Sequence, residues 1–471
     1  AGAAVQPKRI PPPRQSSHGR PRRQWVPPER RLHTTCGVHA VDSVRASSDG
    51  KGGRGRFDPA APGVLSEVPT FELLRGAAIF TACSAQGFIG AMIQLLRAAP
   101  GTPLGQPLLA VARATIFPHF CAGETLQDCR AIAGVYRRSG VSVLVDHSIE
   151  ESEDPEAWGP NLQNKIKLLE GVRRELGDAG RFVPVKVTAL VSPELLETLN
   201  SVIAADPTHL TAEVDPVHHL SPRSAQLLAA AEDNLDQLCT AAKTIGVPVL
   251  LDAEQSHRQH GIDYLAKRAM RRHNADGHAI VYNTYQMYMV GAGERVRRDL
   301  AAAEEQGYCF AAKVVRGAYL VSEAERAVEL AQPSALHPTK EATDRTYNAA
   351  VRQVLERIAA DATAAAVVVA THNTASVKAA VDTMTELNVP PGCPHVNFGQ
   401  VMGMCDHLAA ALGKAGYNAN KLVLFGQFDD VFPWLLRRLD ENRDMLGAAQ
   451  RDRVLLMSEL RRRLNPAART A

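Results

Sequence analysis

Charged side chains interrupt or close several short apolar runs of this chain. Lys186 stands inside the apolar segment Phe182–Val187, and Asp252 and Glu254 lie at the end of the run that begins at Val247. Burying such a charge is costly unless it meets a ligand or a partner of opposite charge. Lys186 is therefore a candidate anion-binding residue. An ion pair inside the fold, with Asp252 or Glu254 balancing the charge, is the structural alternative.

Two further apolar runs end in residues with binding chemistry. The segment Lys313–Tyr319 carries Lys313 and Arg316 ahead of a glycine and an aromatic ring, a pattern suited to holding a phosphate and stacking a flat ring. Thr371-His372-Asn373 closes another run. A single histidine is more often structural than catalytic, but four polar run ends in one chain favour a shared site.

A pair of adjacent arginines, Arg437 and Arg438, lies in the stretch 431–442, whose pattern predicts an amphipathic helix. Neighbouring side chains on a helix point about 100° apart, so both reach one small anion only beside a pocket. Guanidinium groups match a carboxylate through paired hydrogen bonds. The alternative is a solvated basic face.

The elements that must position these residues alternate along the chain. Short apolar, β-branched runs are separated by helical patterns, as in parallel strands joined by helices. The runs are Val141–Asp146, Val183–Ala189, Val247–Asp252, Ala279–Asn283, Phe310–Val315, Val367–Thr371, His395–Gly399 and Lys421–Phe425. They predict a (β/α)8 barrel with its active site at the strand carboxyl ends. A doubly wound sheet is the structural alternative.

The polar residues at the ends of these runs are Asp146, Lys186, Asp252, Asn283, Arg316, His372 and Gln400. The sequence has no GxGxxG after a predicted strand and no GxxxxGK[ST] loop. A nucleotide cofactor would therefore have to be held by the top of the barrel.

Composition narrows the class of protein. The chain has 471 residues, is 45% hydrophobic and has a formal net charge of only +3, which gives no reason to expect nucleic-acid binding. Its eight cysteines include no CxxC pair, so we predict buried, reduced thiols and no metal site.

The chain divides into three predicted regions. Residues 1–57 are rich in Arg, Pro, Ser and Gly, with Glu29, Asp42 and Asp49 as the only acids, which predicts a disordered organelle-targeting leader. A basic tail without a role is the alternative. We expect residues 58–140 to form a helical region and residues 141–465 the barrel. The uncharged stretch Gly76–Leu96 predicts a buried or surface-docked helix, leaving peripheral membrane contact open.

Six motifs in this order resemble those of the proline dehydrogenase family, over roughly Val141 to Leu464. They are Asp252-Ala253-Glu254, Tyr282–Gln286, Val315–Tyr319, Ala370–Asn373, Gly403–Asp406 and Leu436–Asn442. The resemblance implies a barrel that holds FAD noncovalently, with a final helix over the substrate.

The resemblance also implies residue roles. Asp252 and Lys313 would be catalytic, and Glu150 would gate the pocket by pairing with the first arginine. The substrate-binding residues would be Lys186, Tyr319, Val401, Leu422, Arg437 and Arg438. The FAD-binding residues would be Asn283, Lys313, Arg316, Gly317, Ala318, Thr371, His372 and Glu441. Bacterial members carry glutamine at the position given to Asn283 and arginine at that of Lys313.

The expected reaction is FAD-dependent oxidation of L-proline to 1-pyrroline-5-carboxylate in mitochondria, with a quinone accepting the electrons at the matrix side and peripheral inner-membrane contact left open. Leu422 replaces the tyrosine of most proline-specific members, and Trp434 replaces another, so hydroxyproline is the alternative substrate. A barrel without flavin, acting as a binding or scaffold protein, and a lysine-dependent aldolase are the alternatives from other classes.

Overall fold

A computed structural model describes residues 56–83, 94–96, 98, 102, 105–147, 154–206, 208–209, 213–275, 277–441 and 446–465. Within these, side chains are described except those of residues 434, 437–441 and 446–449. The predicted leader, apart from residues 56 and 57, and the gating residue Glu150 lie outside the described residues.

Eight parallel strands close into a barrel. They are β2 (Val141–His147), β3 (Gly180–Lys186), β4 (Val249–Asp252), β5 (Val281–Gln286), β6 (Phe310–Val315), β7 (Ala365–Ala370), β8 (Val396–Val401) and β9 (Ala419–Phe425). Consecutive strands pair in parallel, and β9 pairs with both β8 and β2, which closes the ring. This confirms the predicted (β/α)8 barrel.

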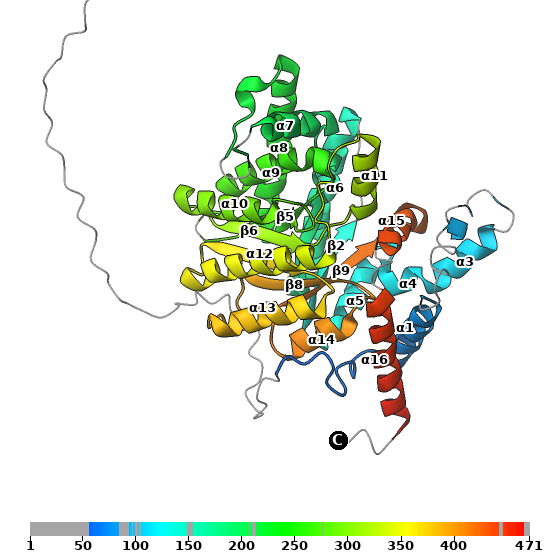
Figure 1. Cartoon of the computed structure of the whole chain (residues 1–471). Coiled ribbons are helices and arrows are strands. Elements are labelled where there is room, and N and C mark those ends of the chain that lie inside the picture. The colour runs from blue at the N-terminus through cyan, green and yellow to red at the C-terminus, as the bar shows by residue number, and fades with distance from the viewer. Residues whose placement is uncertain are drawn as a thin grey trace, which may run out of the picture. The chain divides into compact units, whose positions relative to one another are not determined.

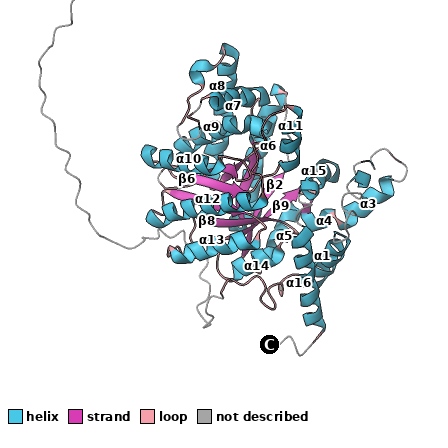
Figure 2. Ribbon diagram, viewed as in Figure 1, coloured by secondary structure: helices cyan, strands magenta, loops and turns pink. Residues whose placement is uncertain are grey.

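Helices surround the strands (Figures 1 and 2). The outer helices are α6 (Pro155–Leu176), α7 (Pro193–Ala205), α8 (Pro222–Ile245), α9 (Ser256–His273), α10 (Ala292–Gln306), α11 (Leu320–Glu329), α12 (Lys340–Ala360), α13 (Thr374–Glu386) and α14 (Asp406–Lys414). Helix α15 (Phe428–Glu441) follows the last strand. Among the described residues, no helix is long and apolar enough to cross a membrane.

The segment before the barrel contains a strand as well as helices. It contains α1 (Thr70–Cys83), α3 (Gly105–Thr115), α4 (Phe117–Phe120) and α5 (Leu126–Arg137), but also the short strand β1 (Cys121–Gly123), which the sequence analysis did not predict. Strand β1 pairs in parallel with β9, and the C-terminal helix α16 (Leu446–Leu464) packs against α1. Helices α1 and α16 thus pack together beside α14 of the barrel.

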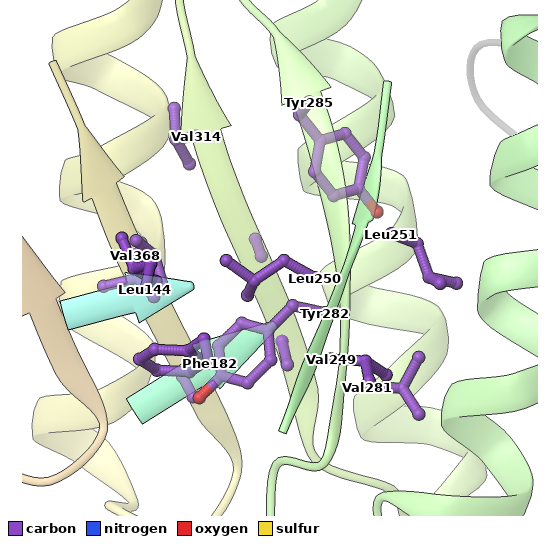
Figure 3. Packing of buried hydrophobic residues seen from close by; sticks show 14 of the residues in the cluster. Leu144, Phe182, Val249, Leu250, Leu251, Val281, Tyr282, Tyr285, Val314 and Val368 are labelled. Atoms are coloured by element: carbon purple, nitrogen blue, oxygen red, sulfur yellow. The ribbon is translucent and has the colours of Figure 1, made fainter. Parts of the chain in front are cut away.

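Side chains alternate between the barrel interior and the helix layer, as a two-residue strand period requires. Phe182 and Tyr282 meet inside the barrel with ring centroids 5.4 Å apart, and Leu250 lies beside them (Figure 3). Tyr285, an odd number of residues from Tyr282, points outward and donates a hydrogen bond to Asp299 of α10 at 2.9 Å. The alternation fixes which polar residues of each strand reach the site.

Candidate active site

An acid and a lysine form an ion pair at the carboxyl end of the barrel. Asp252 is the last residue of β4, and Lys313 lies in β6. Their side chains are 27% and 15% exposed, and Lys313 Nζ contacts Asp252 Oδ1. Two more residues lie at the same level of the barrel. Lys186 of β3 is the backbone register partner of Asp252, and Thr284 of β5 is the register partner of Lys313. Four adjacent strands therefore contribute one row of polar residues.

Thr284 in this row is a buried hydroxyl. The residue is 2% exposed, and its Oγ1 has no hydrogen-bond partner among the described residues. Leaving a buried hydroxyl unpaired is unfavourable by about 1–3 kcal/mol. A polar ligand at the barrel mouth would remove this penalty, so the row has the character of a binding site.

Arg316 ties the ends of β6 and β7 to two helices. Its Nε and Nη2 donate to Asp344 Oδ1 at 3.0 and 2.7 Å, Nη2 donates to Ser376 Oγ at 2.8 Å, and Nη1 donates to Thr371 Oγ1. The guanidinium also lies 4.5 Å from the ring centre of Tyr347. Four of its five N–H donors are thus engaged. Arg316 therefore holds Thr371 in place.

The acid that fixes Arg316 stays ionised. Burial alone would raise the pKa of Asp344, but hydrogen bonds from Lys340 and Arg316 lower that pKa overall. The Arg316–Asp344 pair is therefore charged at neutral pH.

The turn after β6 brings backbone close to an aromatic ring. Gly317 has φ +157°, and a Cβ there would lie 2.4 Å from the ring of Tyr288, so only glycine fits. The next amide, Ala318 N, donates to Gln286 Oε1 at 3.1 Å, while Gln286 Nε2 donates to the Glu254 carbonyl at 2.8 Å. Tyr319 then begins α11 as its N-terminal cap residue. The Gln286 amide links β5 to the loops after β4 and β6.

His372 is a neutral hydrogen-bonding group. Burial, together with the charge of Lys421, lowers its pKa to about 3. Its Nε2 accepts a hydrogen bond from the Val401 backbone amide at 2.9 Å, so the single proton of the neutral ring sits on Nδ1. The ring therefore offers a fixed donor beside the end of β8.

Val401 and Leu422 are register partners on β8 and β9, and both are partly exposed while most of their strand neighbours are buried. Leu422 also pairs with Leu144 of β2. Leu422 thus lies on the apolar side of the barrel mouth, away from the row of polar residues on β3 to β6.

Asn283 does not fit the FAD-contacting role expected for it. It is fully buried on the outer face of β5, where its Nδ2 donates to Asp263 of α9 at 2.9 Å. Strand alternation is the physical reason: Tyr282, Thr284 and Gln286 face inward, and Asn283 faces the helices. The strand continues to Gln286, three residues beyond the predicted end, and the amide at the barrel mouth is Gln286.

The side chains of several predicted site residues are not among those that the structure describes. Arg437, Arg438 and Glu441 belong to α15, but their side chains are not among those described. Their roles, like that of Glu150, stay predictions.

The sequence analysis also missed Lys421. This lysine is fully buried on the outer face of β9, forms an ion pair with Asp406 at 2.6 Å and donates to the Val401 carbonyl at 3.2 Å. It braces the loop that carries Val401. Lys421 is the charged first residue of the predicted run Lys421–Phe425, and that charge was the available signal.

The chain forms a closed parallel barrel, and lysines, an acid and an amide lie at the carboxyl ends of its strands. These features define a (β/α)8 protein with a site for small-molecule chemistry at that face. Residues 130–451 match the family model described as proline dehydrogenase. The chain belongs to the proline dehydrogenase family, of the eukaryotic type.

Similar proteins are named either proline dehydrogenase or hydroxyproline dehydrogenase. The chain is 31% identical to proline dehydrogenase 2, mitochondrial, of Arabidopsis thaliana over 428 residues, 85% of this chain and 89% of that protein. It is 34% identical to hydroxyproline dehydrogenase of Bos taurus over 381 residues, 75% of this chain and 82% of that protein. Identity alone does not decide between the two substrates.

Solved structures share the fold. Proline utilization A from Bdellovibrio bacteriovorus, inactivated by N-propargylglycine, superposes with a TM-score of 0.64 at 17% identity over 87% of this chain. The match spans 44% of that longer protein, so this chain corresponds to less than half of it.

Proposed function

We propose that this protein oxidises L-proline to 1-pyrroline-5-carboxylate with FAD as its cofactor. The observation that carries the proposal is the row formed by Lys186, Asp252, Thr284 and Lys313 at the mouth of a barrel of this family. The reaction removes a hydride from ring carbon C5 and a proton from the ring nitrogen, leaving a carbon–nitrogen double bond. Bound FAD supplies the hydride acceptor, which no side chain can provide.

The described residues fit such a cofactor. Lys313 and the His372 Nδ1 proton are hydrogen-bond donors at the strand ends. Gln286 Nε2 donates one of its two N–H groups to the Glu254 carbonyl, and the other would serve the cofactor. Thr371 and Ala318 would also hold the cofactor, with Glu441 reaching it from α15. The buried Thr284 hydroxyl, which has no hydrogen-bond partner within the described part of the chain, marks a polar position that the cofactor would occupy.

The substrate would be held by its carboxylate. Lys186 ends β3 beside Asp252, and Arg437 and Arg438 would approach from α15. Holding the carboxylate at one end orients the ring toward the hydride acceptor, and such orientation is a large part of catalysis. Tyr319, Val401 and Leu422 would contact the ring, and Glu150 would close the pocket.

The proposed setting is the mitochondrion, because the Arabidopsis relatives are named mitochondrial and residues 1–57 have a leader-like composition. The electrons would pass to a quinone on the matrix side. Peripheral contact with the inner membrane belongs to the same proposal.

The direct test is to mix the FAD-loaded protein with proline in the absence of oxygen. We expect proline to bleach the flavin absorbance near the visible maximum, and added ubiquinone-0 to restore it, while NAD does not. A protein that cannot be loaded with FAD, or whose flavin stays oxidised with both proline and hydroxyproline, would refute the proposal.

Gln286 and Asn283 should differ sharply when each is replaced by leucine. Gln286→Leu removes a donor and acceptor at the barrel mouth, and we expect FAD affinity to fall about five- to tenfold, the value of about one hydrogen bond. Asn283→Leu removes a buried partner of Asp263, and we expect a loss of about 1–3 kcal/mol in unfolding free energy with FAD affinity unchanged. Flavin titration of the apoprotein and urea unfolding measure the two effects. If Asn283→Leu lowered FAD affinity and Gln286→Leu did not, Asn283 would be the FAD-contacting amide after all.

A further inference from the structure

A second cavity lies outside the barrel mouth, between the N-terminal helices, α14 and α16. Its volume is about 120 Å³, and its apolar walls include Phe80, Ile132, Val135, Met402, Ala410 and Leu456. An apolar cavity of about 150 Å³ is large enough to hold benzene. This cavity, which we call the α1–α16 cavity, is somewhat smaller, so it has room for at most one six-membered ring.

Two buried nitrogens among its lining residues have no hydrogen-bond partner within the described part of the chain. They are Arg75 Nε and His119 Nε2, and His119 is only 7% exposed. Burial lowers the pKa of His119 to about 4, so the ring is neutral at physiological pH and carries one N–H. Arg75 Nε is always a donor. Unpaired buried polar atoms call for a polar ligand or water.

Two acidic residues that line the cavity are held in ion pairs with basic residues. Asp406 pairs with Lys421 at 2.6 Å, His407 contacts Asp452 at 2.8 Å, and Glu72 pairs with Arg75. Arg75 Nη2 is further held by the Pro118 carbonyl at 2.6 Å. The carboxylates of Glu67 and Asp452 also line the cavity, so they would repel an anionic ligand. A neutral ring with hydrogen-bond acceptors on its edge suits these walls better.

The cavity is separated from the proposed cofactor site by a single loop. Met402, Gly403 and Cys405 line the cavity, and Val401, directly before them, donates to His372. Cys405 Sγ lies 3.6 Å from the His372 carbonyl oxygen. A molecule in the cavity would thus contact the other side of the loop that holds His372.

We propose that the α1–α16 cavity binds the ring of the quinone that reoxidises the enzyme, an inference that rests on the proposed function. In that step two electrons and two protons would pass from the reduced cofactor to the quinone, whose two carbonyls would become hydroxyls. His119 and Arg75 are the residues that hold the quinone oxygens, and the apolar walls hold its ring.

The test measures quinone binding directly. Isothermal titration of the oxidised, FAD-loaded protein with ubiquinone-0 gives the affinity, for the original chain and for Leu456→Trp, which fills the cavity. Leu455→Trp is the matched control, because it is the adjacent residue of α16 and does not line the cavity. We expect at least a fivefold loss of affinity in Leu456→Trp and in His119→Phe, and no loss in Leu455→Trp.

Turnover separates this inference from the proposed function. In Leu456→Trp and His119→Phe, we expect a lower ratio of turnover with ubiquinone-0 to turnover with dichlorophenolindophenol. Proline-driven flavin bleaching in the original chain tests the proposed function alone. Equal ubiquinone-0 affinity in all four proteins, or no binding to the original chain, would overturn the cavity assignment. If Leu456→Trp fails to fold, Val135→Phe takes its place.

Discussion

Lys313→Met is expected to lower kcat/KM for proline by at least about 30-fold. Lys313 forms the ion pair with Asp252 at the centre of the row of polar residues, and both side chains are mostly buried. Truncating one partner of such a pair costs about 2–5 kcal/mol, because the other charge is left unpaired. Since 1.36 kcal/mol corresponds to about tenfold, even the lower bound gives about 30-fold. Methionine keeps the length of the side chain, so the change isolates its charge.

The matched control is Lys340→Met. Lys340 also pairs with an acid, Asp344, but its side chain is 66% exposed and lies on the surface of α12. Exposed pairs of this kind contribute about 0–1 kcal/mol, so kcat/KM should change less than about fivefold. Steady-state kinetics with dichlorophenolindophenol, corrected for FAD content by absorbance, provide the comparison. If kcat/KM of Lys313→Met stayed within threefold of the original value, the Lys313–Asp252 ion pair would not be part of the active site.

The strands and helices of the barrel were predictable because their apolar runs are long and regular. The predicted run Phe310–Val315 coincides with β6, and the run predicted at Val141–Asp146 is observed as β2 at Val141–His147. Where a run ends in polar residues, the boundary was less certain. The run predicted to end at Asn283 continues to Gln286. The apolar pattern stops earlier than the strand because Thr284 and Gln286 face a polar barrel mouth.

The site itself was predictable only where chemistry and strand period agreed. Asp252 and Lys313 are inward-facing charges at strand ends, and the structure brings them into contact. Counting in steps of two along β5 would have selected Gln286 in place of Asn283. The α1–α16 cavity had no local signal, because it depends on α1 packing against α16, some 370 residues later in the chain. The same holds for β1, whose pairing with β9 joins segments about 300 residues apart.

Relatives named for proline and for hydroxyproline match this chain to similar extents, and we propose that Leu422 decides between the two substrates. Leu422 lies between Val401 and Leu144 in an apolar part of the barrel mouth and is partly exposed there. Its side chain leaves more room than the tyrosine of most proline-specific members. It also offers a 4-hydroxyl no hydrogen-bond partner, and burying an unpaired hydroxyl costs about 1–3 kcal/mol. We therefore expect proline to be preferred, with weaker discrimination and a higher KM than in relatives that carry tyrosine.

Leu422→Tyr should then sharpen the choice. The larger ring would fill the space beside Val401, lower the KM for proline and exclude the 4-hydroxyl, changing the ratio of kcat/KM for the two substrates by about 5- to 150-fold, the equivalent of about 1–3 kcal/mol. Leu424→Tyr is no substitute, because Leu424 is fully buried in β9. Leu422→Phe is the better control: it fills the same space without a hydroxyl and separates size from hydrogen bonding. The measurement is kcat/KM for L-proline and trans-4-hydroxy-L-proline in the three proteins. If the original chain prefers hydroxyproline by tenfold or more, the physiological substrate is hydroxyproline and the smaller side chain at Leu422 is what admits its hydroxyl.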